Sequence, residues 1–274
     1  MFASAGVAVE VWDHERSHSV QSMPWGSDGI TSVRFNPAET ELLAASTSDR
    51  GVALYDLRTG TALRKLVMQT KANRVSWNPQ MPFTFVVAND DACLYTYDMR
   101  RLSAAKCVHE DFVSAVTDVD FSPTGREFVA GGYDRTLRIF AVDGGHSRDV
   151  YHTKRQQRVA AVAFSGDGSY VFSGSDDMNL RVWKAEASAP QGIVMPRERR
   201  HLDYAAALVE RHKHLPEVRR IHRARHLPKA VLRAQQLRRV QIDAEAKKTR
   251  NRVAQSGGKK PKPARQRKVV AELQ

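Results

Sequence analysis

LRVWK at residues 180–184 is one of five short apolar stretches in the chain that are closed by an aromatic residue. The other four stretches are VEVWD (9–13), VALYD (52–56), LYTYD (94–98) and LRIFA (137–141). The closing aromatics are Trp12, Tyr55, Tyr97, Phe140 and Trp183, and successive ones are 43, 42, 43 and 43 residues apart. The sequence therefore contains an internal repeat of 42 to 43 residues.

Two further landmarks keep the same register. An aspartate stands six residues before each of the last four aromatics, and these are Asp49, Asp91, Asp134 and Asp177. Farther upstream recur VRFNP (33–37), VSWNP (75–79), VDFSP (119–123) and VAFSG (162–166). Each unit reads as short alternating strands divided by turn residues. The period and the aromatic-Asp pattern are typical of WD repeats, so we predict an all-β fold, a WD-repeat β-propeller whose blades stack on one another.

The repeated aspartates are expected to lie in the tight turn between the second and third strands of each blade. There a carboxylate can accept hydrogen bonds from the turn and hold the edge of the blade. Catalysis or metal binding is the alternative, but a residue that recurs once per blade favours a structural role. The aromatics of the repeat, including Trp12 and Trp183, are interpreted as core anchors in the same way.

The first repeat unit of the chain is predicted to be partial. Residues 1–13 are interpreted as the remnant of a preceding blade that opens at the end of a third strand, and residues 14–184 as four complete blades. Four blades are at the low end for closed propellers, and an open array exposes two edges. An incomplete gene model, a fragment or help from another chain would each account for this. The blade that ends at Trp183 is expected to lack its outer strand.

Charge is distributed unevenly along the 274 residues, whose formal charge is +13. Residues 1–183 hold 19 Lys and Arg against 22 Asp and Glu, whereas residues 184–274 hold 24 against 8. A basic segment attached to a near-neutral body indicates a polyanionic partner, with RNA, DNA and anionic lipid as candidates. The two cysteines, Cys93 and Cys107, form no metal-like pair and favour a reducing compartment. No membrane span and no signal peptide are predicted.

The basic segment is predicted to be a helical domain over residues 185–255, followed by a flexible basic tail over 256–274. Pro196 favours a first helix, whose apolar stripe is expected to pack on the propeller or on a partner. Pro216 and Pro228 each favour a new helix. The stripe consists of Leu202, Ala205, Ala206 and Val209, and the apolar residues of the last helix are Val231, Leu232, Leu237, Val240 and Ile242.

HKHLPEVRRIHRARHLPKA at residues 212–230 combines six Lys or Arg residues and four histidines with one carboxylate, Glu217. His222 and His226 could share a helix face, but neighbouring arginines and the absence of cysteine disfavour a metal site. A merely solvated face would mix both signs of charge. Instead, no Asp or Glu occurs from Val218 to Ile242. We therefore expect contact with RNA or ribonucleoprotein, ahead of acidic protein patches or a membrane surface.

The expected contacts are arginines and lysines whose side chains suit phosphate oxygens. They are Arg211, Lys213, Arg219, Arg220, Arg223, Arg225, Lys229, Arg233, Arg238, Arg239, Lys247 and Lys248. Tyr204 is the only aromatic residue after Trp183, which favours recognition of backbone and shape over stacking on bases. The sequence shows no nucleophile elbow, P-loop, dinucleotide turn or HExxH motif, so neither an enzyme nor a cofactor or metal is expected.

Several stretches resemble the SOF-domain WD-repeat family. They are SMPWGSDGITSVRFNP (22–37), YDMRRL (97–102), VSAVTDVDFSPTGREFV (113–129), RDVYHTKRQQRV (148–159), SGSDDMNLRVWKAEAS (173–188) and HLPEVRRIHRARHLPKA (214–230). The most specific are YHTKR (151–155) and RHLPK (225–229), which generic propellers lack. Members of this family are longer at the front and carry a seven-bladed ring, so the chain is similar to their last four blades and tail and is N-terminally incomplete by comparison.

The resemblance implies a role in the nucleus, within the nucleolus. The family belongs to the small-subunit processome, which assembles on pre-rRNA with the U3 snoRNP and is needed for 18S rRNA processing. In animals it is also described as a substrate receptor of a cullin-type ubiquitin ligase. YDLR (55–58) and YDMR (97–100) resemble the ending that docks such propellers on the ligase adaptor, with Arg58 and Arg100 as docking residues. A surface arginine after a strand is the alternative for each.

Overall fold

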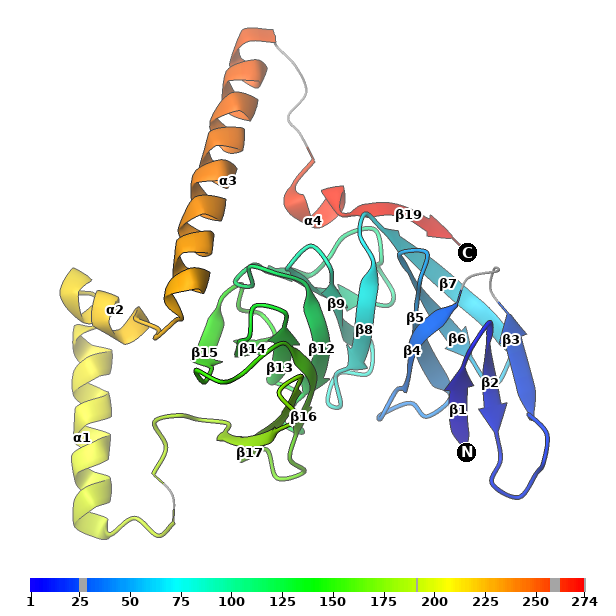
Figure 1. Ribbon diagram of the computed structural model, residues 1–274, viewed down its shortest axis with the longest axis horizontal. Coiled ribbons are helices and arrows are strands. Elements are labelled where there is room, and N and C mark those ends of the chain that lie inside the picture. Colours follow the sequence, from blue (N-terminus) through cyan, green and yellow to red (C-terminus); the bar gives the residue numbers. More distant parts are fainter. Residues whose placement is uncertain (25–28, 191, 257–261, 274) are drawn as a thin grey trace.

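The computed structural model describes residues 1–24, 29–190, 192–256 and 262–273, and its body is a row of five antiparallel sheets (Figure 1). The first sheet contains β1 (Phe2–Ala5), β2 (Ala8–Trp12) and β3 (Gln21–Pro24). The second contains β4 (Ile30–Phe35), β5 (Leu42–Thr47), β6 (Gly51–Asp56) and β7 (Thr61–Met68). The third contains β8 (Ala72–Trp77), β9 (Thr84–Asn89), β10 (Leu94–Asp98) and β11 (Cys107–His109).

The last two sheets continue the same plan. One contains β12 (Val116–Phe121), β13 (Glu127–Gly132), β14 (Leu137–Ala141) and β15 (Ser147–Tyr151), and the other β16 (Val159–Phe164), β17 (Tyr170–Ser175) and β18 (Leu180–Lys184). Four of the repeated aromatics, Tyr55, Tyr97, Phe140 and Trp183, lie near the end of the third strand of their sheet, whereas Trp12 ends the second strand of the first sheet. The WD-repeat propeller is confirmed. Within the described residues the sheet that ends at Lys184 has three strands, as expected for a blade without its outer strand.

The first sheet is larger than the predicted remnant over residues 1–13. It holds three strands and ends at Pro24. Phe2 pairs in register with Trp12, and their rings stack at a centroid distance of 6.3 Å. The hairpin before Trp12 was missed because β1 is only four residues long and its burial does not alternate.

The hydrophobic core is divided among the interfaces between neighbouring blades. One cluster joins Leu54 and Leu66 to Trp77 and Tyr95 of the next blade, and another joins Val86 to Phe121. Gly131 lies where two blades approach closely, since a Cβ atom there would stand 2.6 Å from Cγ1 of Val159. The stacking of blades therefore supplies the burial that no single sheet achieves.

The repeated aspartates lie in the turns between second and third strands. In each turn the next residue has a positive φ: 69° at Arg50, 64° at Ala92, 64° at Arg135 and 60° at Met178. Asp49, Asp91 and Asp134 each accept a hydrogen bond from the backbone amide two residues later, at 3.2, 3.1 and 3.0 Å. A carboxylate that holds the following amide stabilises this left-handed turn.

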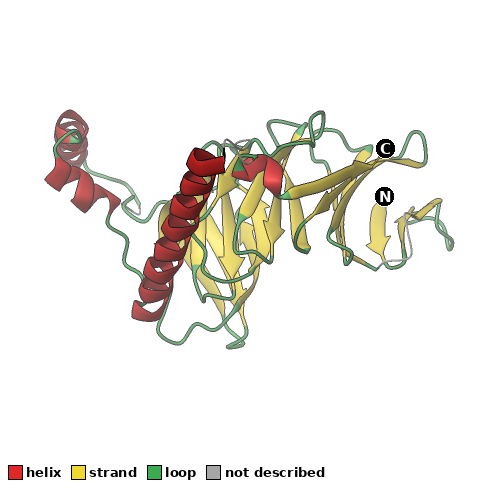
Figure 2. Ribbon diagram, turned by 90° about the horizontal axis from the view of Figure 1, so that it is seen from above, coloured by secondary structure: helices red, strands yellow, loops and turns green. Residues whose placement is uncertain are grey.

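Three longer helices follow the blades: α1 (Pro196–His212), α2 (Pro216–Arg223) and α3 (Lys229–Ser256). Proline stands at the start of both α1 and α2. The expected packing of the α1 stripe on the propeller is not found, because α1 contains no buried residue and Leu202 and Val209 are both 40% exposed. Both views show α1 and α2 away from the blades (Figures 1 and 2). No helix of the described residues is long and apolar enough to cross a membrane.

Residues 262–273 differ from the predicted flexible tail. They contain α4 (Ala264–Arg267) and β19 (Val269–Leu273), and β19 pairs antiparallel with β7 as a fifth strand of that blade. The outer edge of β7 offers unpaired backbone groups, and β19 pairs with this edge. An ion pair between Arg64 and Glu272, at 3.2 Å, joins the two strands. The remainder of the predicted tail, apart from Ser256, lies at 257–261 and 274, outside the described residues.

Candidate nucleic-acid interface

Helix α3 docks on the blades through one face. Val231 is 7% exposed, and one helical turn later Nε2 of Gln235 donates to the carbonyl oxygen of Asp111 at 2.7 Å. Nη1 of Arg238 donates to the carbonyl oxygen of Phe112 at 2.6 Å. Residues 231, 235 and 238 share a face because a helix has 3.6 residues per turn. The start of α3 is therefore held in a defined orientation on the propeller.

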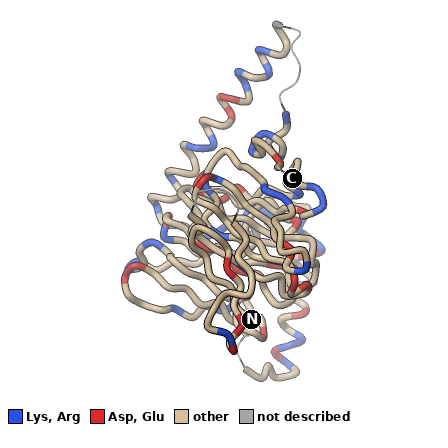
Figure 3. Tube along the Cα trace, turned by 90° about the vertical axis from the view of Figure 1, so that its right-hand side faces the viewer, with Lys and Arg blue, Asp and Glu red and all other residues tan. Residues whose placement is uncertain are grey.

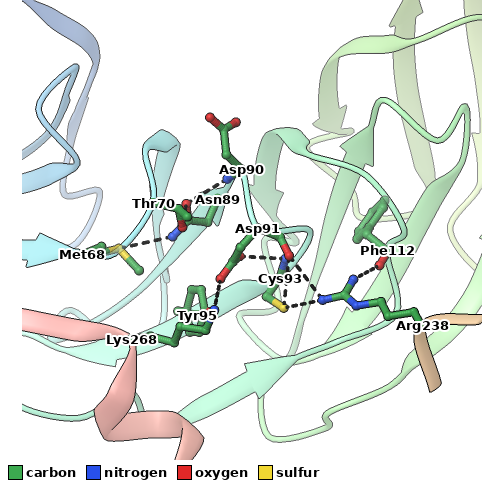
Figure 4. A network of polar contacts seen from close by, with 10 residues as sticks. All are labelled: Met68, Thr70, Asn89, Asp90, Asp91, Cys93, Tyr95, Phe112, Arg238 and Lys268. Atoms are coloured by element: carbon green, nitrogen blue, oxygen red, sulfur yellow. Dashed lines mark hydrogen bonds and ion pairs between the residues drawn. The ribbon is translucent and has the colours of Figure 1, made fainter. Parts of the chain in front are cut away.

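Arg238 also reaches the turn that follows β9 (Figure 4). Its Nη2 atom donates to the carbonyl oxygen of Asp91 at 3.3 Å and to Sγ of Cys93 at 3.5 Å. Burial and the nearby Asp91 carboxylate raise the pKa of Cys93 to about 11 despite the arginine, so the thiol is neutral at physiological pH. Arg238 was expected to contact phosphate, but its guanidinium is occupied by protein groups in the docking of α3.

The carboxylate of Asp91 in the same turn holds the end of the chain. It accepts from the backbone amide of Cys93 at 3.1 Å and from the hydroxyl of Tyr95 at 2.5 Å, and it pairs with Nζ of Lys268 at 3.0 Å. Figure 4 shows Arg238 and Lys268 approaching this turn from opposite sides. One turn of one blade therefore anchors both α3 and the segment that precedes β19.

Gln235 and Lys268 are anchors that no sequence pattern indicated. The spacing of Val231, Gln235 and Arg238 is a helical face, but it mixes one apolar residue with two polar ones. The expected apolar residues Leu232, Leu237, Val240 and Ile242 are instead between 44% and 64% exposed. Hydrogen bonds to backbone carbonyls, rather than apolar burial, position this helix, and hydropathy does not reveal them.

Other predicted cations of α3 lie outside the docked face. Arg233 and Lys247 fall on the side opposite Val231 by the 3.6-residue period, whereas Lys229 in the first turn borders the blades. They are exposed, as are Arg239 and Lys248. Lys and Arg recur along the length of this helix (Figure 3). The propeller therefore presents one side of α3 as a cationic surface.

The cations before α3 are also exposed. The set comprises Arg211, Lys213, Arg219, Arg220 and Arg225. Lys213 pairs with Glu210, and Nη1 of Arg225 donates to the carbonyl oxygens of His222 and Ala224 at 3.0 and 3.2 Å. The side chain of Arg223 lies outside the described part of the chain. We call these five residues together with Lys229, Arg233, Arg239, Lys247 and Lys248 the basic surface.

The two stretches that are most specific in the sequence meet in space. His152 of YHTKR stacks on His226 of RHLPK with a centroid distance of 5.2 Å and an interplanar angle of 16°. Nε2 of His152 lies 3.1 Å from Nδ1 of His226 and 3.1 Å from its carbonyl oxygen. A blade loop and the segment that leads into α3 therefore contact each other directly through the two motifs.

Arg58 and Arg100 have the same geometry in successive blades. Each guanidinium forms a two-pronged hydrogen bond with the aspartate two residues earlier, at 3.2 and 3.0 Å for Asp56 and at 3.1 and 2.8 Å for Asp98. Hydrogen bonding to these arginines lowers the pKa of both carboxyl groups. The arginine side chains are 68% and 66% exposed. Arg58 and Arg100 are therefore accessible at equivalent positions of two successive blades.

Comparison with known proteins finds two matching families. The description "Sof1-like domain" applies to residues 185–269, and "WD domain, G-beta repeat" to residues 105–140 and 145–184. Neither description names a catalytic domain. The Sof1-like match begins directly after β18 and includes all three long helices and the anchor Lys268.

Among curated proteins, the chain is similar to two that are called DDB1- and CUL4-associated factor 13. It is 48% identical over 250 residues to the one from Danio rerio, and 45% identical over 271 residues to the one from Xenopus laevis. Protein SOF1 of Saccharomyces cerevisiae is 44% identical over 250 residues. The match to the Danio rerio protein covers 91% of this chain and 56% of the relative, and the match to the Xenopus laevis protein covers 98% and 61%. The match to Protein SOF1 covers 91% of this chain and 51% of the relative. The chain thus spans less than two thirds of the length of each.

Proposed function

The chain belongs to the SOF-domain-containing WD-repeat family, and from this we propose that it is a non-enzymatic ribosome-biogenesis factor of the small-subunit processome. In this role it scaffolds assembly and 18S rRNA processing in the nucleolus. Its partners are pre-rRNA, the U3 snoRNP and other processome proteins. The blades supply protein-binding surfaces, and the basic surface contacts RNA.

One observation carries the proposal. The basic surface is exposed on helices that have few acidic neighbours, and α3 is held at its start by Gln235 and Arg238. Like charges so close together repel one another unless a polyanion neutralises them. Each phosphate that a cation neutralises releases counterions, which supplies binding energy at physiological salt. A docked helix also loses less conformational entropy on binding than a free one does.

A charge-reversal variant tests the proposal. Arg219→Glu, Arg220→Glu and Arg225→Glu are combined in the full chain, and association with pre-rRNA and U3 RNA is measured by immunoprecipitation and RNA quantification. The triple variant is expected to lose most of the RNA signal, while the melting temperature of the blades stays the same. The control is Arg16→Glu, in the loop between β2 and β3, which should retain the signal. Full RNA recovery by the triple variant would refute the assignment.

A second candidate function is that of a substrate receptor of a cullin-type ubiquitin ligase. The repeated geometry of Arg58 and Arg100 favours it, as do the relatives whose name refers to DDB1 and CUL4. In both stretches a tyrosine takes the place of the usual tryptophan. Pull-down with DDB1 tests this function: Arg58→Ala with Arg100→Ala should abolish capture, whereas Arg16→Ala should not.

A further inference from the structure

A cleft of about 640 Å³ lies between the blades and the start of α3. We call it the seam cleft. Its blade side includes Tyr133, Arg135, Lys154 and Gln156, and its α3 side includes Lys229 and Ala230. The volume is within the range that small organic ligands occupy in proteins. His152 and His226, which stack on each other, form part of the same lining.

The charge of the seam cleft favours an anion. Arg135, Lys154 and Lys229 line it and are exposed. Its carboxylate is Asp134, and the Oδ1 atom of that residue accepts from the amide and hydroxyl of Thr136 at 3.0 and 2.6 Å. Oδ2 of Asp134 faces the guanidinium of Arg138 at 3.5 Å. Asp134 therefore bonds within its own blade through Oδ1, and the three cations outnumber it in the lining of the cleft.

The first turn of α3 adds hydrogen-bond donors. The amide of Leu232 is bonded to the carbonyl oxygen of Pro228, so the amides of Lys229, Ala230 and Val231 precede the helical ladder. These three residues line the cleft, and helix N-termini bind phosphate groups through such amides and the helix dipole.

A buried amide group is a second and independent feature of the cleft. Gln156 is 0% exposed and lines the seam cleft. Its Oε1 atom accepts from the amide of Thr153 at 3.2 Å, but its Nε2 atom has no hydrogen-bond partner among the described residues. A buried donor without a partner destabilises the folded chain. A ligand acceptor at the floor of the cleft would satisfy it.

Tyr133 gives the cleft an aromatic surface. Its side chain is 44% exposed, and Cζ of Arg158 lies over the ring at 5.3 Å from the centroid. Stacking on exposed aromatic rings is how proteins hold the bases of single-stranded nucleic acid. The extension itself carries Tyr204, which is on α1 and away from this cleft. The blade thus supplies the aromatic contact that the extension lacks.

We infer that the seam cleft binds one nucleotide of single-stranded RNA, with the base on Tyr133 and its phosphate at the first turn of α3 beside Lys154. This inference rests on the proposed function and adds a place where unpaired RNA is held between the two family motifs. The basic surface binds phosphates of either single or paired strands, whereas the seam cleft requires an unpaired base.

Photocrosslinking tests the inference on the full chain. A short single-stranded RNA that contains 4-thiouridine is bound, irradiated and mapped by mass spectrometry, and affinity is measured by fluorescence anisotropy. Crosslinks are expected in the peptide that contains Tyr133. Tyr133→Ala should weaken single-stranded binding about tenfold and leave duplex binding the same. Tyr133→Phe retains the ring and should restore both the crosslink and the affinity, and Tyr170→Ala, which removes an exposed tyrosine outside the cleft, is the control.

The two levels of proposal fail differently. If RNA binds but crosslinks map only to α1–α3 and Tyr133→Ala binds normally, the seam cleft is not a nucleotide site and the proposed function stands. If the chain binds no RNA at all, both are wrong. If an acidic peptide of polyglutamate displaces the RNA and crosslinks to the same peptide whether or not Tyr133 is present, the cleft is a protein-binding site instead. Circular dichroism confirms that each variant is folded.

Discussion

Nζ of Lys268 lies 3.0 Å from the carboxylate of Asp91, although one residue precedes the last strand and the other lies in a turn of the third sheet. The same turn receives Arg238 of α3 through the carbonyl oxygen of Asp91. A residue that recurs once per blade for a local reason therefore has, in this blade, an additional long-range role. Asp49, Asp134 and Asp177 of the other blades instead pair with Lys65, Arg138 and Arg181.

Removing the Arg238 side chain is expected to release the start of α3. Arg238→Ala loses charged hydrogen bonds to two backbone carbonyls, and each contributes about 1.5 to 3 kcal/mol to docking. Hydrogen–deuterium exchange should accelerate in residues 229–242 while exchange in β12–β14 stays the same. The neighbouring Arg239→Ala is the control, because Arg239 is exposed. Equal protection in both variants would show that Arg238 does not anchor the helix.

The ion pair of Lys268 is expected to support strand β19. Lys268 is one third exposed in its pair with Asp91, so Lys268→Ala should cost about 1 kcal/mol of docking free energy. This corresponds to about fivefold faster opening of β19, measured as amide exchange of residues 269–273. Arg267→Ala, which removes an exposed cation next in sequence, should leave exchange the same. Should both variants exchange alike, the pair with Asp91 contributes nothing to the strand.

His109 is expected to make the propeller sensitive to acid. Burial lowers its pKa from 6.5 to about 4, and the neutral ring lies 2.9 Å from the Thr96 hydroxyl and 2.5 Å from the Gly144 carbonyl oxygen. The unfolded chain binds a proton in this range and the folded chain does not. The stability from the neutral ring is therefore complete above pH 6.5 and is lost as pH falls to 4, at most about 3 kcal/mol.

Urea unfolding at pH 7 and pH 4.5 measures this effect. His109→Asn should be less stable at pH 7 and should lose less stability on acidification than the unchanged chain. His18→Asn, at an exposed position, should retain the full pH dependence. Identical acid sensitivity of the His109→Asn variant and the unchanged chain would assign the effect to other groups.

Binding of RNA is expected to depend steeply on salt. Each phosphate contact to a single strand contributes about −0.7 to the slope of log Kobs against log salt concentration. Arg219→Ala, Arg220→Ala and Arg225→Ala together should therefore reduce the magnitude of that slope by about 2. Titrations at four salt concentrations measure it, with Arg16→Ala as control. A slope that does not change would mean that these three arginines touch no phosphate.

Repetition made the propeller predictable. Five aromatics at a spacing of 42 or 43 residues and four aspartates define the strand ends and turns, because each turn depends on contacts within a few residues. The exposed cations of residues 218–242 were predictable as well, since the absence of Asp and Glu from this stretch is visible in the order of residues alone. Arg238 has the same side chain as its exposed neighbour Arg239, and nothing local distinguishes their roles.

The short first hairpin and β19 were not predictable for a related reason. The hairpin from Phe2 to Trp12 is too short for a strong alternating signal, and VVAEL becomes a strand only beside the open edge of β7. In both cases the stabilising partner is supplied by another segment. The seam cleft likewise arises where Tyr133 and Lys154 of the blades meet Lys229 of α3.

The order of residues by itself determined the blade repeat, the turns that close each hairpin and the sign of charge on the extension, because these depend on near neighbours or on composition. Three features depend on tertiary structure. Arg238 and Lys268 both contact the turn at Asp91, β19 adds a fifth strand beside β7, and His152 contacts His226. Such contacts form between residues distant in sequence, where the free energy comes from pairing groups that no local pattern brings together.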